Sequence, residues 1–208
     1  MPLIRKPANN STPANPNAAM DVLTALQSEN KDERWAAARQ AATLPESAGA
    51  LATALRSESD PRVREAIFTS LARIGTTPSI EAILQFLRSD DASHRAGALD
   101  ALRSQITAIR AHLPALLSDQ DSDVRLLCCE LARSLPSDEA TTVLSDLLAR
   151  ESEANVCAAA IEVLAEAGRP EALNALSQCE ARFRDTPFLA FAIKIARERI
   201  AQSTSRHG

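Results

Sequence analysis

Apolar residues recur at helical spacing along most of the chain. The clearest stretch is residues 61–74, where one helix face would carry Val63, Ala66, Ile67, Ser70, Leu71 and Ile74. Asp60 is placed to cap this helix, Pro61 stands at its first position, and Gly75 follows its last. Shorter leucine-rich stretches, as at residues 80–87 and 140–148, predict a second kind of helix between such segments. The pattern therefore predicts pairs of helices.

The start of the helix at residue 61 recurs along the chain. It appears as Asp60-Pro-Arg-Val-Arg64, Asp91-Ala-Ser-His-Arg95 and Asp121-Ser-Asp-Val-Arg125, with a weaker copy at Glu153-Ala-Asn-Val-Cys157. The spacings are 28, 31, 30, 32 and 33 residues when the equivalent positions are Trp35, Val63, His94, Val124, Val156 and Leu189. A period near 31 residues is typical of a solenoid whose units each hold two short helices.

The repeat predicts an all-α fold, an α-solenoid of about six antiparallel helix pairs. The pairs are expected at roughly residues 20–44, 46–75, 78–104, 106–135, 137–168 and 170–202. Residues 1–19 are rich in Pro, Asn, Ser and Thr and predict a disordered leader, and residues 203–208 predict a short disordered tail.

Paired helices of this length, with an Asp-x-x-Val-Arg start to the second helix, resemble HEAT repeats. The short HEAT-like repeats of bilin lyases and small bacterial scaffold proteins are the most similar, and the resemblance covers about residues 20–202. It implies a curved solenoid whose second helices line the concave face. It also implies a protein-binding surface rather than one fixed activity.

Composition narrows the possible fold classes, and charge narrows the possible partners. Tyrosine is absent, aromatic residues make up 3%, and 5 of the 208 residues are glycine, which argues against β-sandwiches and nucleotide-binding α/β folds. Residues 1–180 carry 17 basic and 25 acidic side chains, so we expect no nucleic-acid partner. We also expect no membrane association, because no apolar run approaches the roughly 18 residues of a membrane span. The four cysteines lie inside helical apolar patterns, which predicts a reducing, cytoplasmic location.

Catalytic or metal-binding patterns are sparse. The three histidines precede Arg95, Leu113 and Gly208, so the His-Glu pairs typical of the similar diiron hydroxylases are missing. The four cysteines lack the C-x-x-C spacing of zinc or redox sites. Cys128 falls on the buried stripe, whereas Cys157 replaces the recurring arginine and is expected to be more accessible. We therefore expect no metal, no cofactor and no enzymatic activity.

Two sets of charged residues recur in register on the second helices. Arg64, Arg95 and Arg125 border the buried stripe and predict a structural arginine ladder with loop aspartates, ligand contact being the alternative. Asp119 is well spaced to pair with Arg125. Six residues after each equivalent position, an exposed acidic row is predicted, formed by Asp100, Glu130 and Glu162. This row is either solvated or a docking strip for a basic protein segment, with nearby Arg103 and Arg133 making its charge mixed.

The last predicted helix departs from the pattern. Phe188, Phe191 and Ile195 occupy positions that are polar in the other second helices. Either this helix packs in a different register, or it carries an apolar patch for a partner or for self-association. The predicted function is a non-catalytic adaptor or scaffold, in bacterial intracellular signalling or assembly, that binds another protein on the concave second-helix face. The alternative is a lyase-like or chaperone-like HEAT protein acting on a pigment-bearing or modified protein.

Overall fold

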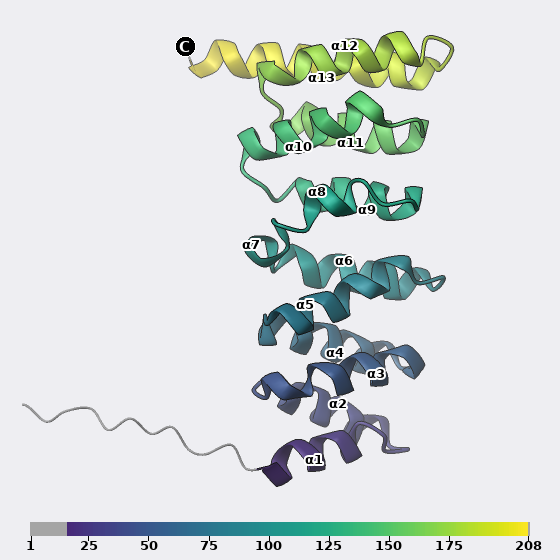
Figure 1. The fold of residues 1–208 in the computed structure, drawn as a ribbon, viewed down its shortest axis with the longest axis vertical. Helices are drawn as coiled ribbons and strands as arrows, with labels where there is room; N and C mark the ends of the chain where they lie inside the picture. Colours follow the sequence, from purple (N-terminus) through teal and green to yellow (C-terminus); the bar gives the residue numbers. More distant parts are fainter. Residues whose placement is uncertain (1–15, 208) are drawn as a thin grey trace, which may run out of the picture.

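Antiparallel helix pairs stack along the long axis of the molecule, from α1 at one end to α13 at the other (Figure 1). The computed structural model describes residues 16–207, and side chains for residues 20–203. The described chain contains helices and turns but no strand. The all-α solenoid of six helix pairs predicted from the repeat is confirmed.

Each pair consists of a first helix and a second helix. The first helices are α1 (Pro16–Ala25), α3 (Ala48–Ser57), α5 (Thr77–Leu84), α7 (Ile106–Ile109) with α8 (Leu113–Leu116), α10 (Ser137–Arg150) and α12 (Leu173–Arg182). The second helices are α2 (Lys31–Ala41), α4 (Pro61–Ile74), α6 (Ala92–Arg103), α9 (Ser122–Ala132), α11 (Ala154–Ala167) and α13 (Pro187–His207). Short 3₁₀ segments adjoin α3, α5 and α12 at Pro45–Ser47, Gln85–Arg88 and Pro170–Ala172.

The helices extend beyond the expected domain boundaries. The first helix begins at Pro16, inside the segment predicted as a leader, and α13 continues to His207, through most of the segment predicted as a tail. The remaining leader residues, 1–15, lie outside the part that the structure describes.

The recurring acidic residue begins each central second helix by capping it. The Oδ1 atoms of Asp60, Asp91 and Asp121 accept a hydrogen bond from the N–H group two residues later, at 2.9, 2.8 and 2.9 Å respectively. At the other end of α4, Gly75 adopts a φ of 63° and closes the helix, as predicted.

The first repeat starts at a different position from the one predicted. Asn30 caps α2, because its Oδ1 accepts the N–H of Asp32 at 2.9 Å. Counted from the cap, the residue equivalent to Val63 is Glu33, so the predicted equivalence of Trp35 was wrong by two positions.

Two layers of helices enclose one continuous core. The second helices pack in chain order, α2 on α4, α4 on α6, α6 on α9, α9 on α11 and α11 on α13. The first helices form the other layer, with α3 on α5 and α10 on α12. Among the largest side chains fully buried between the layers are Leu51, Ile67, Leu71, Ile83 and Leu102. The stack is therefore held by apolar packing between neighbouring repeats.

The cysteines belong to this core. All four are free and buried, and burial raises the pKa of the Cys128 thiol to about 12, which keeps it protonated. The expected accessibility of Cys157 was wrong, because its side chain is fully buried in α11. His94 is likewise packed, with its ring centroid 5.3 Å from that of Phe86.

Candidate partner-binding surface

Arginines that begin the second helices are held by the protein itself. Arg34, Arg95 and Arg125 each donate through Nη1 to the carbonyl oxygens six and five residues earlier, at 2.7–3.1 Å. Arg64 instead lies 3.5 Å from the Asp91 carboxylate of the next repeat. Of the three predicted ladder arginines, only Arg64 reaches a loop aspartate carboxylate, whereas Arg95 and Arg125 contact carbonyl oxygens of their own turn. Arg34 makes the same turn contacts in the first repeat.

Asp119 contacts Arg125, but not in the way that the spacing predicted. Its main-chain carbonyl oxygen accepts the hydrogen bond at 2.7 Å, while its carboxylate pairs with Arg88. The turn, rather than the aspartate side chain, holds the arginine.

Two buried glutamates, which the sequence analysis missed, join neighbouring repeats. Arg34 donates to both carboxylate oxygens of Glu58 at 2.7 and 3.0 Å, and Arg125 donates to those of Glu151 at 2.6 and 2.9 Å. Each pair is bidentate and links the second helix of one repeat to the turn of the next. The signal for them was an acidic residue two positions before the cap residue.

The charged partners lower the pKa of both glutamates. The hydrogen bond from Arg34 holds the pKa of Glu58 below its usual value. Burial acts to raise the pKa of Glu151, but the hydrogen bonds from Arg125 and from the following backbone N–H groups outweigh it and lower the pKa. Both carboxylates are therefore ionised near neutral pH and are part of the framework.

The predicted acidic row is a chain of paired charges. Arg103 lies 3.0 Å from Asp100 and 3.7 Å from Glu130. Arg133 lies 3.3 Å from Glu130 and 3.8 Å from Glu162, and it also pairs with Glu166. We call these six residues the charge ladder. Every carboxylate of the row has an arginine partner, so its negative charge is partly compensated within the protein, although the four carboxylates of the ladder outnumber its two arginines.

The final helix packs in the same register as the other second helices. Leu189, Ile193 and Ala196 are fully buried, whereas Phe188 and Phe191 are 50% and 68% exposed and Ile195 is partly exposed. The structure thus gives no support to the different register. Counted from the start of each helix, Phe191 corresponds to Glu65 of α4, so the apolar patch lies on the same second-helix face.

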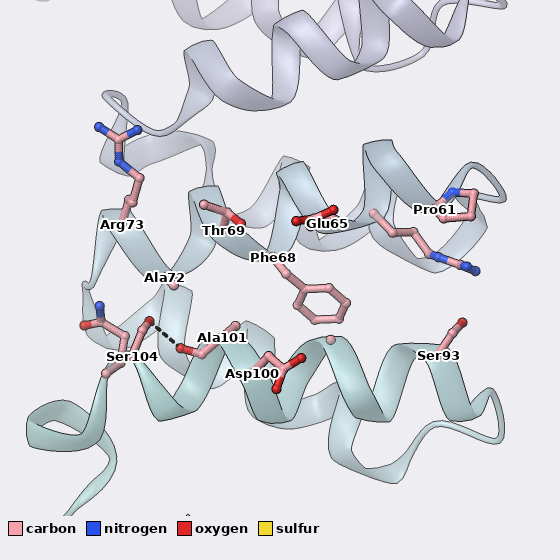
Figure 2. Close-up of a pocket in the computed structure, with 13 residues that line it drawn as sticks. Pro61, Glu65, Phe68, Thr69, Ala72, Arg73, Ser93, Asp100, Ala101 and Ser104 are labelled. Atoms are coloured by element: carbon pink, nitrogen blue, oxygen red, sulfur yellow. Dashed lines mark hydrogen bonds between the residues drawn. The ribbon is translucent and has the colours of Figure 1, made fainter. Parts of the chain in front are cut away.

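A groove of about 680 Å³ runs between α4 and α6 on this face. Figure 2 shows the ring of Phe68 projecting from α4 towards α6, with Ala72 and Ala101 beside it. Gly97 of α6 permits this approach, because a Cβ atom there would lie 2.6 Å from two atoms of the Phe68 ring. Small residues opposite an aromatic ring therefore give the groove an apolar floor.

The rim of the groove is polar. Glu65, Thr69 and Arg73 line it from α4, and Asp100 lines it from α6 (Figure 2). Among the side chains that the structure describes, neither Glu65 nor Arg73 forms an ion pair. Glu65 and Arg73 therefore keep their charges available to a ligand, whereas Asp100 is paired with Arg103 of the charge ladder.

A second cleft, of about 290 Å³, adjoins the groove on its α2 side. Glu65, Thr69 and Arg73 line both spaces, so the two adjoin over α4. The far wall holds Trp35, whose ring centroid lies 4.7 Å from the Arg39 guanidinium carbon and 5.5 Å from that of Arg62. Groove and cleft together form an amphipathic surface over α2, α4 and α6.

Within residues 16–207, no helix is both long and apolar enough for a membrane span. Over the same part of the chain, no cluster of three or more His, Cys, Asp or Glu side chains is arranged to hold a metal ion.

Comparison with known proteins gives a family match. The family model for HEAT repeats matches residues 19–103 and 109–185. A search of curated proteins gives no match.

Solved structures with a similar arrangement include an archaeal HEAT-like repeat protein from Thermococcus onnurineus NA1, with 13% identity over 90% of this chain and 88% of that one, at a TM-score of 0.48. The complex of CpcE and CpcF of phycocyanin lyase from Nostoc sp. PCC7120 is 16% identical over 96% and 100%, at a TM-score of 0.38. A designed armadillo repeat protein in complex with a (KR)4 peptide is 18% identical over 86% and 98%, at a TM-score of 0.42. At such identities these neighbours do not carry their activities to this chain.

Proposed function

This chain belongs to the HEAT-repeat family, and from that premise we propose that it is a non-catalytic scaffold that binds a peptide segment of another protein between α4 and α6. HEAT repeats are a repeat-type protein-interaction architecture. The observation that carries the proposal is the α4–α6 groove, which combines an apolar floor with a rim where Glu65 and Arg73 have no ion-pair partner among the described side chains. Apolar anchors with a few polar contacts around them are typical of binding sites for peptide side chains.

The groove is a better candidate than the acidic row. A basic segment binding at the row would compete with Arg103 and Arg133, which already pair with its carboxylates. Binding at the groove would place a partner against the Phe68 ring, which is buried at the floor, without breaking an ion pair of Glu65 or Arg73 among the described side chains. Because the groove is formed by packed helices, its side chains lose little freedom when a partner binds.

A substitution that fills the groove tests this proposal. Thr69 is exposed at the rim, so Thr69→Trp would cover the floor without disturbing a buried side chain. Thr107→Trp is the matched control, because Thr107 is exposed on the first-helix layer in α7. Circular dichroism would establish that both variants keep the helical fold.

The readout is selection from a library of random peptides displayed on phage. We expect the wild type and Thr107→Trp to enrich the same family of peptides, and Thr69→Trp to lose it. Selection of no peptide by the wild type would contradict the proposal, and so would selection of the same peptides by Thr69→Trp.

A further inference from the structure

We propose that the cleft between α2 and α4 recognises acidic side chains of a partner segment whose apolar residue lies in the α4–α6 groove. This inference rests on the proposed function and adds the chemistry of the partner. We call the three arginines of this cleft, Arg39, Arg62 and Arg73, the arginine cluster.

Charge is the first argument. The arginine cluster faces a single lining carboxylate, Glu65, which leaves a local surplus of positive charge in a chain of net charge −4. Arg39 and Arg73 have no carboxylate partner among the described side chains. Arg62 lies 3.7 Å from Asp32, with both side chains well exposed, so solvent weakens that pair. Two of the three arginines therefore lack a carboxylate partner among the described side chains, whereas Arg103 and Arg133 of the charge ladder have two or more acidic partners each.

The Trp35 ring is the second argument. The guanidinium groups of Arg39 and Arg62 both lie within 5.5 Å of the ring centroid. An aromatic surface restricts the arginine side chains and leaves their N–H groups available for a carboxylate. A guanidinium group can bind a carboxylate through two parallel hydrogen bonds. The cleft thus offers partly preorganised donors for Asp or Glu side chains.

The relative positions of the groove and the cleft set the order of residues in the partner segment. Because Glu65, Thr69 and Arg73 line both of them, one segment crossing α4 would contact both. Its apolar residue would cover Phe68, and its acidic residues would lie on the α2 side, near Arg39 and Arg73.

The chain's own ends do not have the required charge. Residues 1–15 contain Arg5 and Lys6 and no acidic residue, and residues 204–208 contain Arg206 and no acidic residue. The positive charge of the arginine cluster instead fits an acidic segment of a partner protein.

Charge reversal tests the inference with the same phage-displayed peptide library. Arg39→Glu combined with Arg73→Glu reverses two exposed members of the cluster. Arg184→Glu combined with Arg199→Glu makes the same change in net charge at exposed positions near the other end of the stack. The affinity of the selected peptides for each protein would then be measured by fluorescence anisotropy at low and high sodium chloride.

We expect the wild type to select peptides in which Asp or Glu residues neighbour a leucine or phenylalanine. Their binding should weaken by at least about tenfold in the Arg39/Arg73 variant, remain unchanged in the Arg184/Arg199 variant, and weaken with added salt. Selected peptides that depend on Thr69 but show no acidic surplus would overturn this inference and leave the proposed function standing. Selection of no peptide would overturn both. A wild-type dimer that the Arg39/Arg73 variant converts to a monomer would make the occupant a second copy and also overturn the inference.

Discussion

At the level of single residues, the most buried ion pairs in the described part of the chain are those of Arg34 with Glu58 and Arg125 with Glu151. Each arginine also holds two carbonyl oxygens of its own turn, and each glutamate also accepts backbone N–H groups. A buried charge that loses its partner is left uncompensated. These pairs are therefore expected to matter for the stability of the repeat stack more than exposed ion pairs do.

Glu151→Ala should lower the free energy of unfolding by about 3–5 kcal/mol, because it leaves the Arg125 guanidinium without its carboxylate. Glu153→Ala is the matched control, since Glu153 is exposed two residues away and should change stability by only about 0.5 kcal/mol. Urea unfolding at neutral pH, followed by circular dichroism, measures both. Similar losses in the two variants would show that the buried pair adds no special stability.

The lowered pKa values of Glu58 and Glu151 predict a dependence of stability on pH. A carboxylate whose pKa is lower in the folded chain than in the unfolded chain stabilises the fold. This contribution is fully present above the unfolded pKa, near 4.5, and is lost as the pH falls through the folded pKa. We expect the free energy of unfolding to fall more steeply below pH 4.5 in the wild type than in the double variant Glu58→Gln with Glu151→Gln. Urea titrations at a series of pH values measure the slope, and parallel curves would contradict this account.

At the level of elements, the contact between α4 and α6 depends on a glycine facing an aromatic ring. Gly97→Ala would place a Cβ atom 2.6 Å from the Phe68 ring, which is itself buried, so the ring must move. We expect a loss of about 1–3 kcal/mol and weaker binding of peptides selected on the groove. Gly49→Ala in α3 is the control, because its Cβ would have no atom within 4 Å, and it should stabilise by about 0.5–1 kcal/mol. Thermal unfolding of the two variants measures the difference, and equal unfolding midpoints would show that the Phe68 ring moves without loss of stability.

The last helix allows a direct test of its apolar patch. Phe191→Ser should leave the fold intact because this side chain is 68% exposed, whereas Ile193→Ser replaces a fully buried one and should lower stability by about 2–5 kcal/mol. We propose that the patch also mediates self-association, so light scattering should show concentration-dependent dimers in the wild type but not in Phe191→Ser. A wild type that stays monomeric at all concentrations would rule out the self-association.

The helix pairs could be predicted from sequence because their signals are local. Asp60, Pro61 and Gly75 fix one helix within a short stretch of chain, and the repeat period extends the same assignment to the other pairs. The buried arginine–glutamate pairs and the groove depend instead on contacts between repeats. Arg34 reaches Glu58 across 24 positions, and Phe68 meets Gly97 from the neighbouring helix, so neither contact follows from the pattern within one repeat.

At the level of the whole molecule, the second-helix face divides into two parts along the stack. Over α6, α9 and α11 the charge ladder pairs its charges within the protein, whereas over α2 and α4 two members of the arginine cluster, Arg39 and Arg73, have no carboxylate partner among the described side chains. In a solenoid each repeat contacts only its neighbours, so a change at one end has little effect on the other. The two parts should therefore respond separately to mutation.

Reversing charges in each part tests this division. Glu130→Lys with Glu162→Lys sets cations beside Arg103 and Arg133. We expect this variant to lose about 0.2–1 kcal/mol of stability for each ion pair lost, and less at high salt. Its peptide binding should be unchanged. Arg39→Glu with Arg73→Glu should instead weaken peptide binding and change the free energy of unfolding by no more than about 0.5 kcal/mol. Urea unfolding and fluorescence anisotropy on the same four proteins, the two variants, the wild type and the Arg184/Arg199 control, measure both effects. If the ladder variant also lost peptide binding, recognition would extend over the whole second-helix face, and the ladder arginines would have to exchange partners when the peptide binds.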